Sequence, residues 1–366
     1  MNRFIAPGSL GEDDERVQNT LRPRTLAEFV GQELQKQRLD IALRAAKGRG
    51  EPLEHLLLHG PPGLGKTTLS TIVSHEMGGK LITTSGPALE KAVDLMGMLT
   101  NLEEGDVFFI DEIHRTPRQI EEYLYPAMED FKVDFVLDKG PFAKAIQLPL
   151  KRFTLVGATT RKGLLSSPLR DRFGLDFALD FYSVEDLTQI VTRSAHLLEV
   201  DIEPPAAREI ARRSRGTPRI ANRLLRRVRD YAQVSGAERV DPERVRQSLE
   251  LEGVDELGLD ELDRRYLRTL LQQYEGGAVG VSALAATMQQ ELDTLEDVIE
   301  PYLLHEGFIL RTSAGRRASP KAYAHMRIAP PRRRSGQAEL PLEDGALGAS
   351  LDRPTPPNPP GAPRSG

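Results

Sequence analysis

Cysteine is absent from this sequence of 366 residues. The chain therefore cannot form disulfides, use a thiolate in catalysis or build a cysteine-type zinc finger, and this is compatible with a reducing cytoplasm. Long apolar runs are lacking too, since none approaches the ~18 residues that span a bilayer. The N-terminal stretch MNRFIAPGSLGEDDER has no apolar core of a secretory signal. We therefore expect a cytoplasmic protein without a membrane span.

A strong excess of one charge is also missing. There are 49 Lys and Arg against 54 Asp and Glu, for a net charge of −5, which taken alone argues against nucleic acid. The charge is segregated, however, with nine arginines between Arg208 and Arg229 and five basic residues between Arg311 and Arg327. Such stretches indicate either a nucleic-acid partner or a solvated helix face, and composition does not separate the two.

The remaining composition, 39% hydrophobic and 28% charged, is that of a globular protein, and the length suggests two or three domains. We find no internal repeats. Changes in pattern along the chain predict five segments: a flexible arm (1–20), an α/β domain (21–182), a helical domain (183–254), a small third domain (255–328) and a disordered tail (329–366) that holds nine of the 26 prolines.

Short apolar runs in the first half predict buried strands of a parallel sheet. They lie at His55–His59, Val107–Ile110 and Phe153–Val156, the last continuing to a polar end at Thr160. Helical patterns, such as that over 32–47, separate them, which is typical of an α/β domain. Alternating residues over 131–150, around a Lys-Gly-Pro turn at 139–141, predict an inserted β-hairpin.

The stretch GPPGLGKT at residues 60–67 matches the phosphate-binding P-loop pattern. It follows a predicted strand and precedes a predicted helix, which is the context that a P-loop requires. Gly63 and Gly65 let backbone N–H groups turn toward phosphates, and the helix presents its positive dipole end. Lys66 is expected to reach the β- and γ-phosphates and the Thr67 hydroxyl to bind Mg²⁺. The sequence thus predicts ATP and Mg²⁺ as cofactors.

Asp111 and Glu112 follow the second apolar strand. Carboxylates at the carboxyl end of a strand face the ligand crevice of an open α/β sheet. We expect Asp111 to hold Mg²⁺ through water and Glu112 to act as general base on the attacking water. A solvated acidic pair is the alternative, and the neighbouring P-loop argues against it. His114 remains unassigned.

Three further residues are candidates for sensing or stabilising the γ-phosphate. Thr160, beside Thr159 at the end of the third strand, is placed to bind the attacking water or the phosphate. Arg172, in SPLRDRF, is a candidate arginine finger supplied across a subunit boundary, with Arg170 as the alternative and a surface ion pair with Asp171 as the non-catalytic interpretation.

Arg219 is the third of these candidates. Thr217 and Pro218 before it predict an N-cap and the first residue of a helix, whose apolar face would carry Ile220, Leu224, Leu225 and Val228. This would fix Arg219 at a helix start, from which it could reach the γ-phosphate, and such a contact from a lid domain would turn hydrolysis into motion.

The order of these motifs resembles the AAA+ superfamily, and longer stretches resemble the RuvB family of bacterial Holliday junction branch migration ATPases. The resemblance covers roughly residues 15–328. It rests on LRP (21–23), LAEFVGQ (26–32), HGPPGLGKTTL (59–69), FFIDEIHR (108–115), YPAMEDF (125–131), LVGATTRKGLLSSPLRDRFG (155–174) and SRGTPRIANRLLRRVRDYA (214–232).

The resemblance implies a hexameric ring that acts in recombination and DNA repair with a RuvA-like junction-binding protein, docked through the 131–150 hairpin, and with a RuvC-like resolvase as a further candidate partner. Phe131 and Phe142 add apolar surface to that hairpin. The resemblance also implies a nucleotide pocket with Arg172 as arginine finger and Arg219 as second sensor. Besides these two arginines, the pocket would be formed by Leu21, Arg22, Gly63, Gly65, Lys66, Thr67, Thr68, Glu129, Asp130, Phe131 and Tyr182.

The third domain is expected to be a winged helix. Helices are predicted over Asp260–Tyr274, Ser282–Met288 with Ser282 as N-cap, and Thr294–Leu304, and a hairpin wing follows over 307–318. The inward positions of the third helix would be Leu295, Val298, Ile299 and Tyr302. As in the family, Arg311 and Arg316 would contact DNA phosphates, which provide affinity without sequence readout. No aromatic platform for single strands is apparent, which favours duplex DNA.

We therefore expect a three-domain ATP hydrolase with a P-loop AAA+ α/β domain, an all-α lid and a C-terminal winged helix, acting as a DNA motor. Two other functions stay open at this point. A AAA+ protein remodeller or clamp loader would be stimulated by protein rather than by junctions. An ATP-switched winged-helix regulator would bind a specific DNA sequence with negligible turnover.

Overall fold

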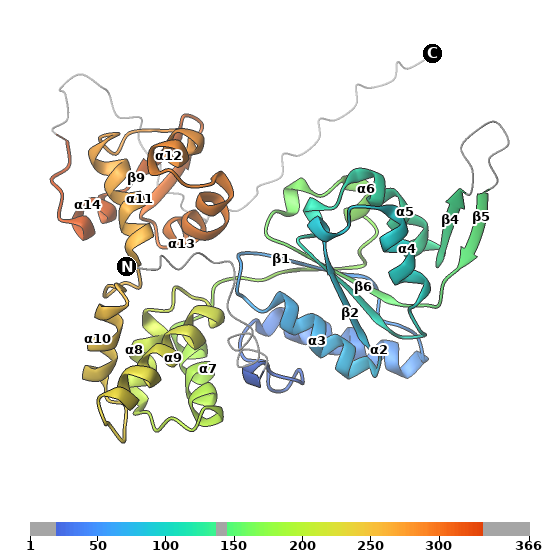
Figure 1. Cartoon of the computed structure of the whole chain (residues 1–366), viewed down its shortest axis with the longest axis horizontal. Coiled ribbons are helices and arrows are strands. Elements are labelled where there is room, and N and C mark those ends of the chain that lie inside the picture. Colours follow the sequence, from blue (N-terminus) through green and yellow to red (C-terminus); the bar gives the residue numbers. More distant parts are fainter. Residues whose placement is uncertain (1–19, 137–144, 332–366) are drawn as a thin grey trace, which may run out of the picture. The chain divides into compact units, whose positions relative to one another are not determined.

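The computed structural model describes residues 20–136 and 145–331. Along the chain it contains an α/β region, a helical region and a second mixed region (Figure 1). None of the described helices is both long enough and apolar enough to cross a membrane.

A five-stranded parallel sheet forms the centre of the α/β region. The strand order is β2-β3-β6-β1-β7. Strand β1, which leads into the P-loop, therefore lies between β6 and β7. The strands span Leu56–His59 (β1), Leu81–Ser85 (β2), Val107–Asp111 (β3), Thr154–Thr159 (β6) and Leu175–Ala178 (β7).

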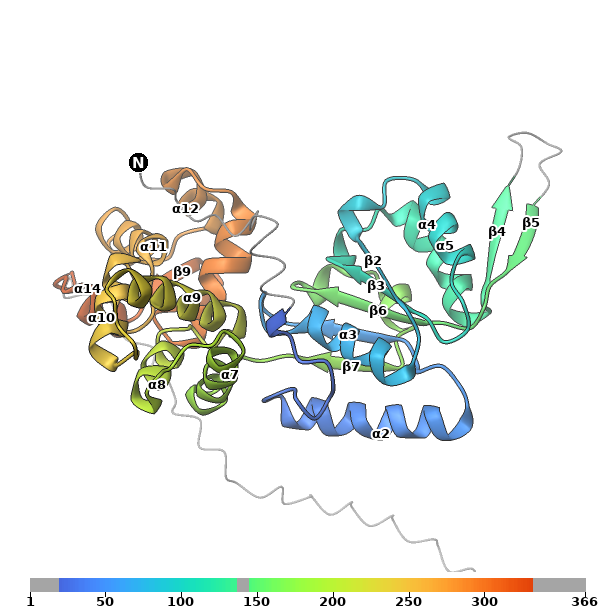
Figure 2. The ribbon, with the colours of Figure 1, turned by 60° about the horizontal axis from the view of Figure 1, so that its bottom comes forward.

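Helices cover both faces of this sheet, which explains why its strands appear in the sequence as continuous apolar runs. Leu56 and Leu58 pack with α2 (Glu33–Arg49) and α3 (Lys66–Met77), whereas Leu57 packs on the opposite face with α4 (Ala92–Thr100) and α5 (Arg118–Glu129) (Figure 2). Because Leu57 is fully buried, Leu57→Ala would cost about 2–5 kcal/mol.

Strand β6 runs through Gly157 to Thr159 rather than turning at the glycine. A Cβ at Gly157 would lie 3.0 Å from both Ile113 Cδ1 and Phe173 Cζ. The glycine is needed for this close approach of side chains to the strand, and the unbroken strand carries Thr159 and Thr160 to the edge of the sheet.

The inserted hairpin has arms β4 (Lys132–Val136) and β5 (Ala145–Pro149), which pair antiparallel from Lys132 opposite Pro149 to Val136 opposite Ala145. The predicted turn at 139–141 and Phe142 lie outside the described residues.

Four helices follow the sheet: α7 (Val184–Leu197), α8 (Pro204–Arg212), α9 (Pro218–Val234) and α10 (Pro242–Leu251). Ser183 and Asp241 cap α7 and α10 by accepting from backbone N–H groups. Several arginines of this region, however, do not lie on a solvated face. Arg213, Arg215 and Arg226 are buried, and Arg213 pairs with Glu209 at 2.6 Å.

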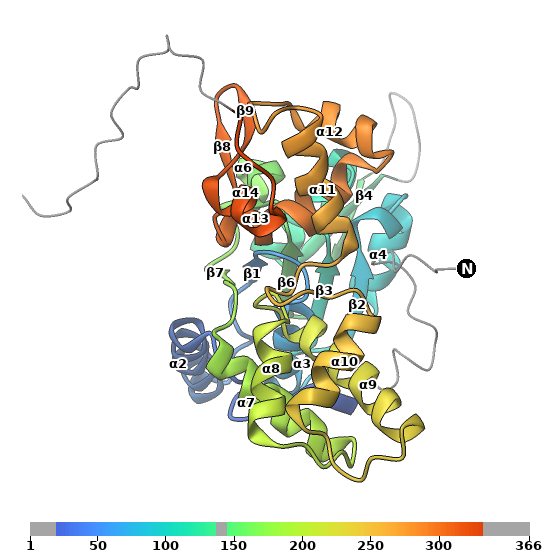
Figure 3. The same ribbon diagram turned by 90° about the vertical axis from the view of Figure 1, so that its left-hand side faces the viewer.

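The last region, which we call the head (residues 255–328), has its own apolar core. Its wing strands lie side by side in Figure 3 and pair antiparallel. Its elements are α11 (Glu261–Gln272), α12 (Val281–Met288), the π-helix η4 (Thr294–Ile299), α13 (Glu300–His305), β8 (Ile309–Thr312), β9 (Gly315–Ala318) and α14 (Pro320–Met326).

Two local predictions for the head were wrong. Ser282 is not an N-cap, because α12 begins at Val281 after Gly280, where Val279 leaves its backbone pairing with Arg316. The predicted single helix over Thr294–Leu304 begins as the π-helix η4. Its wider turn shifts the buried positions, so Val298 is only partly buried.

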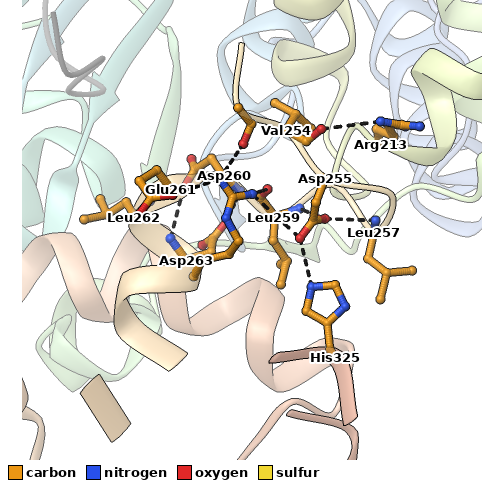
Figure 4. A network of polar contacts seen from close by, with 12 residues as sticks. Arg213, Val254, Asp255, Leu257, Leu259, Asp260, Glu261, Leu262, Asp263 and His325 are labelled. Carbon is orange, nitrogen blue, oxygen red and sulfur yellow. Dashed lines mark hydrogen bonds and ion pairs between the residues drawn. The ribbon is translucent and has the colours of Figure 1, made fainter. Parts of the chain in front are cut away.

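Hydrogen bonds also order the segment that joins α10 to α11 (Figure 4). The Asp255 carboxylate accepts from Leu257 N and Leu259 N, both at 2.9 Å, and lies 2.8 Å from His325 Nε2. Asp260 and Asp263 then form a capping box at the start of α11. These hydrogen bonds therefore stabilise the backbone of the segment between α10 and α11.

Candidate active site

The P-loop leaves β1 at His59 and enters α3 at Lys66. Gly60, with φ 140°, fits only without a side chain, because a Cβ there would lie 2.3 Å from Leu179 O. Gly65 has φ 104° and precedes the first turn of α3. Residues 60–65 therefore wrap around the positive end of a helix, which is the geometry that binds phosphate.

A cavity of about 720 Å³ opens over this loop, within the usual size range of ligand sites. It brings together residues that the sequence places up to 201 positions apart, from the P-loop, the ends of β3 and β6, α9 and the segment before α2. The predicted site residues that line it are Leu21, Arg22, Gly63, Gly65, Lys66, Thr67, Thr68, Asp111, Glu112, Thr160, Tyr182 and Arg219.

Lys66 is held at the start of the loop by backbone carbonyls. Its Nζ donates to Gly60 O at 2.7 Å and to Pro61 O at 2.8 Å. Burial lowers the pKa of Lys66 to about 8, while the Asp111 carboxylate acts in the opposite direction. An anionic phosphate beside the ammonium would favour its charged form and raise that pKa.

Both carboxylates after β3 lie at the cavity wall. Asp111 Oδ1 accepts from Glu112 N at 2.9 Å, and Glu112 has a left-handed backbone with φ 46°. Glu112 Oε2 also pairs with Arg115 Nη1 at 3.0 Å. The two acids therefore share one cavity with Lys66, an arrangement that the solvated-pair alternative does not require.

His114, which the sequence left unassigned, anchors the end of β6. Its Nδ1 lies 2.9 Å from Thr159 Oγ1, which also accepts from Arg161 N at 2.9 Å. Burial lowers the pKa of His114, so the neutral ring is favoured. The contact fixes the backbone next to Thr160, the residue that reaches the cavity.

Another part of the cavity is apolar and aromatic. Tyr182, whose hydroxyl donates to Leu64 O at 3.1 Å, and Phe29 both line it. Arg193 of α7 also lines it and donates to Leu21 O at 2.8 Å, which ties the segment before α2 to the helical region. The Phe29 and Tyr182 rings give this wall the chemistry to pack against a flat base.

Several lining residues were not predicted from the sequence, including Thr83, Ile190, Arg193 and Asn222. Asn222 could have been found, because it lies one helical turn after Arg219 and therefore on the same face of α9. Arg193 offers no such signal, since nothing in the sequence of α7 separates it from an ordinary exposed arginine.

Arg219 sits directly against the P-loop. A Cβ on Gly63 would lie 2.7 Å from Thr217 Cγ2 and 3.1 Å from Arg219 Cβ, so only glycine allows this approach. Thr217 and Pro218 occupy the N-cap and first helical positions of α9, as predicted, although the Thr217 hydroxyl donates to Arg215 O at 2.9 Å and does not cap the helix.

Four predicted pocket residues, Glu129, Asp130, Phe131 and Arg172, do not line this cavity. Arg172 Nη2 donates to Glu129 Oε2 at 3.1 Å, and its guanidinium lies 4.5 Å from the centre of the Tyr125 ring. The ion pair of Arg172 is thus with Glu129 and not with Asp171. Within one chain these residues form a separate cluster.

The two predicted DNA contacts face each other across the wing, with Arg311 opposite Arg316. Both pair with the fully buried Glu300, at 2.7 Å and 2.9 Å, and Tyr266 donates to the same carboxylate at 3.0 Å. The Arg311 side chain is 52% exposed but that of Arg316 only 15%. Arg311 is therefore the more accessible of the two.

Three family models match the chain in succession: the Holliday junction DNA helicase RuvB P-loop domain over residues 21–179, the RuvB AAA lid domain over 182–255 and the RuvB C-terminal winged helix domain over 256–327. Together they cover the α/β region, the helical region and the head.

Solved structures agree with these models. The chain is 52% identical to the RuvB Holliday junction branch migration motor of Thermotoga maritima, with a TM-score of 0.79 over 85% of this chain and 99% of that one. A proline-to-glycine mutant of the same Thermotoga protein matches with 51% identity and a TM-score of 0.80, over 84% of this chain and 99% of that one. The chain belongs to the RuvB family of P-loop AAA+ ATPases, the Holliday junction branch migration motors.

Proposed function

We propose that this chain binds ATP with Mg²⁺ in the cavity over the P-loop and uses its hydrolysis to drive duplex DNA through a ring of identical chains at a four-way junction. The observation that carries the proposal is the convergence of Lys66, Asp111, Glu112, Thr160 and Arg219 on a single cavity, since these residues lie at the starts of α3 and α9 and at the ends of β3 and β6.

The chemistry of the cavity fits a magnesium nucleotide. Among the residues that the structure describes, no cluster of three or more His, Asp or Glu side chains could hold a metal alone. A Mg²⁺ ion would therefore draw on the Thr67 hydroxyl, Asp111, phosphate oxygens and water, as magnesium commonly does. When bound, the ion would neutralise charge that develops on the phosphates.

The protein side chains divide the remaining tasks. Lys66 and the backbone of residues 63–68 would hold the phosphates. Glu112 would take a proton from the attacking water, with Thr160 orienting that water. Arg219 would contact the γ-phosphate and so link the state of the nucleotide to the position of the helical lid, because it extends from the first turn of α9.

A ring is favoured by the position of Arg172 outside the cavity of its own chain. An arginine finger must approach a phosphate, so Arg172 would act on the cavity of a neighbouring copy, accompanied by Glu129, Asp130 and Phe131. By family resemblance we propose that the ring is a hexamer.

The partners follow from the same proposal. The β4–β5 hairpin would dock a RuvA-like junction-binding protein, and a RuvC-like resolvase is a further candidate. Arg311 and Arg316 of the wing would contact DNA phosphates without reading sequence. A motor that moves along any sequence needs contacts of this kind.

One experiment tests the proposal. ATP turnover is measured with and without four-way junction DNA, for the chain alone and with a RuvA-like protein. We expect junction DNA and partner together to raise turnover. Equal rates under all four conditions would contradict the motor function, and stimulation by protein substrates alone would indicate a remodeller instead.

A further inference from the structure

Two arginines attach the head to the rest of the molecule, and each lies within four residues of a nucleotide-cavity residue in the sequence. Arg161 directly follows Thr160 at the end of β6, and Arg215 lies four residues before Arg219 in the loop that leads to α9. Thr160 and Arg219 both line the cavity. If Thr160 or Arg219 changes position, the movement therefore has to pass along only one to four residues of backbone before it reaches an arginine that contacts the head.

Arg161 forms the contact from the α/β region. Its Nε donates to Asp297 Oδ1 at 2.7 Å and its Nη2 to Asp297 Oδ2 at 2.9 Å, with a third bond from Nη2 to Asp293 Oδ1 at 2.9 Å. A two-point arginine–carboxylate pair fixes orientation as well as distance. The side chain is only 22% exposed, which limits screening by solvent.

Arg215 forms the contact from the helical region. Its Nη1 donates to Asp263 Oδ2 at 2.7 Å and its Nη2 to Val298 O at 3.0 Å, while its guanidinium lies 5.0 Å from the centre of the Tyr302 ring. Asp263 is the fully buried member of the capping box of α11 (Figure 4). Arg161 and Arg215 therefore hold successive residues of the head, Asp297 and Val298, from two different regions.

The same short segment also holds the wing. Glu296 Oε1 lies 3.1 Å from Arg316 Nη2, and Glu300 pairs with both Arg316 and Arg311. Glu296 Oε2 is in turn 3.5 Å from Arg161 Nη1. A continuous series of ion pairs thus runs from Arg161 through Glu296, Arg316 and Glu300 to Arg311.

The backbone of this segment is unusual, because Thr294–Ile299 is a π-helix. Insertions of this kind are rare and occur frequently at functional sites. Here the wide turn carries Glu296 and Asp297 on the side of Arg161 while Leu295 and Ile299 stay in the core of the head.

We infer that the segment Thr294–Pro301 couples the nucleotide cavity to the DNA-contacting arginines of the wing, and that Arg161 and Arg215 are positioning residues of this coupling. The inference rests on the proposed DNA contacts of Arg311 and Arg316. Nucleotide that shifts Thr160 or Arg219 moves Arg161 or Arg215, the segment follows, and Glu296 and Glu300 move the wing arginines. By linkage, DNA on the wing must change nucleotide affinity by the same factor.

The test uses the full chain with Asp297→Asn, which removes the carboxylate charge that Arg161 binds at two points and leaves its contacts with Asp293 and Glu296. The matched control is Glu291→Gln, which removes an acid from the same head, at an exposed position that forms no ion pair with any residue in 20–136 or 145–331. Duplex DNA affinity is measured with and without a slowly hydrolysed ATP analogue plus Mg²⁺, and the ratio of the two Kd values is the coupling factor.

We expect Asp297→Asn to reduce the coupling factor about fivefold or more, in line with typical allosteric coupling, and Glu291→Gln to leave it unchanged. Analogue affinity without DNA shows that the cavity of the variant is intact. A coupling factor in Asp297→Asn equal to that of the unmodified chain would overturn the inference while leaving the motor function standing. If the unmodified chain binds DNA with the same Kd with and without the analogue, that result would contradict the motor function itself.

A second variant distinguishes coupling from simple tethering and covers the case in which Asp297→Asn is poorly folded. Arg161→Asp combined with Asp297→Arg exchanges the charges of the pair. Recovery of the coupling factor in this double variant, compared with Arg161→Asp alone, supports the inference. If the double variant is as thermally stable as the unmodified chain but remains uncoupled, the pair is only a structural tether and the inference fails.

Discussion

The nucleotide cavity and the wing of the head hold their cations in opposite ways. In the cavity, Lys66 donates to the neutral carbonyls of Gly60 and Pro61. In the wing, Arg311 and Arg316 are paired with the buried carboxylate of Glu300. A phosphate at Lys66 would replace hydrogen bonds to neutral carbonyls, whereas a DNA phosphate at the wing would replace direct ion pairs with a buried carboxylate.

This difference suits the two ligands. A motor must hold its fuel firmly in one place but must release and rebind DNA as it moves. Lys66 is buried and held by two backbone carbonyls, which favours tight binding of an anion. The wing arginines already share ion pairs with Glu300 and Glu296, so the DNA contacts proposed for them should be weak and exchangeable.

The largest effect is expected for Arg172, which does not line the cavity of its own chain. Arg172→Ala should bind ATP normally but lose about 10³–10⁵-fold in turnover, because the charge that stabilises the transition state would be missing. Nucleotide binding and phosphate release are measured separately. Arg170→Ala, two residues away, is the matched control; if it loses turnover while Arg172→Ala does not, Arg170 is the finger.

Lys66→Ala should lower turnover by about 10²–10³-fold, since it removes a preorganised cation from the phosphates. Duplex DNA affinity in the absence of nucleotide should stay the same, because the wing does not contact Lys66. Filter binding and steady-state phosphate release check the two expectations. Lys80→Ala removes an exposed lysine outside the cavity and should behave like the unmodified chain. A passive DNA-binding regulator would show negligible turnover even before mutation.

The two wing arginines should differ in what they support: Arg311 the affinity for DNA and Arg316 the stability of the head. Arg311→Ala, at the more exposed position, should reduce the salt dependence of DNA binding by a slope of about 1 and leave thermal stability unchanged. Arg316→Ala should cost the head about 1–3 kcal/mol, because Glu300 and Glu296 lose a shared partner. DNA titrations at several salt concentrations and thermal unfolding decide the matter. Equal stability losses in the two variants would show that exposure does not distinguish them.

The smallest effect concerns pH. Burial lowers the pKa of Lys66 to about 8 in the free protein, whereas bound phosphate would raise it, so nucleotide binds best to the protonated lysine. Affinity should therefore be constant below pH 8 and weaken by up to about tenfold per unit as pH rises above it. Calorimetric titrations from pH 7 to 9.5 measure this slope. Lys66→Arg should abolish it, and a slope that persists in that variant would assign the proton to another group.

The sequence predicted most of the cavity because its signals are local. The P-loop is eight consecutive residues, and Asp111, Glu112 and Thr160 directly follow apolar strands whose carboxyl ends must meet at one edge of a parallel sheet. The three-domain order and the wing also followed from apolar spacing and turn residues. The contribution of Arg193 and the role of His114 did not, because each depends on a partner far along the chain, Leu21 and Thr159 respectively.

The amino-acid sequence by itself determined the family of this protein, its domain order and the residues that would meet a nucleotide, because contiguous motifs and strand ends specify these directly. Only the tertiary structure decided that Arg172 and Glu129 lie away from the cavity of their own chain, that Arg311 and Arg316 share Glu300, and that the head is held through Asp297 and Val298. The reason is physical: an arginine can pair with any carboxylate that the fold brings within about 3 Å, and sequence spacing says nothing about which one that will be.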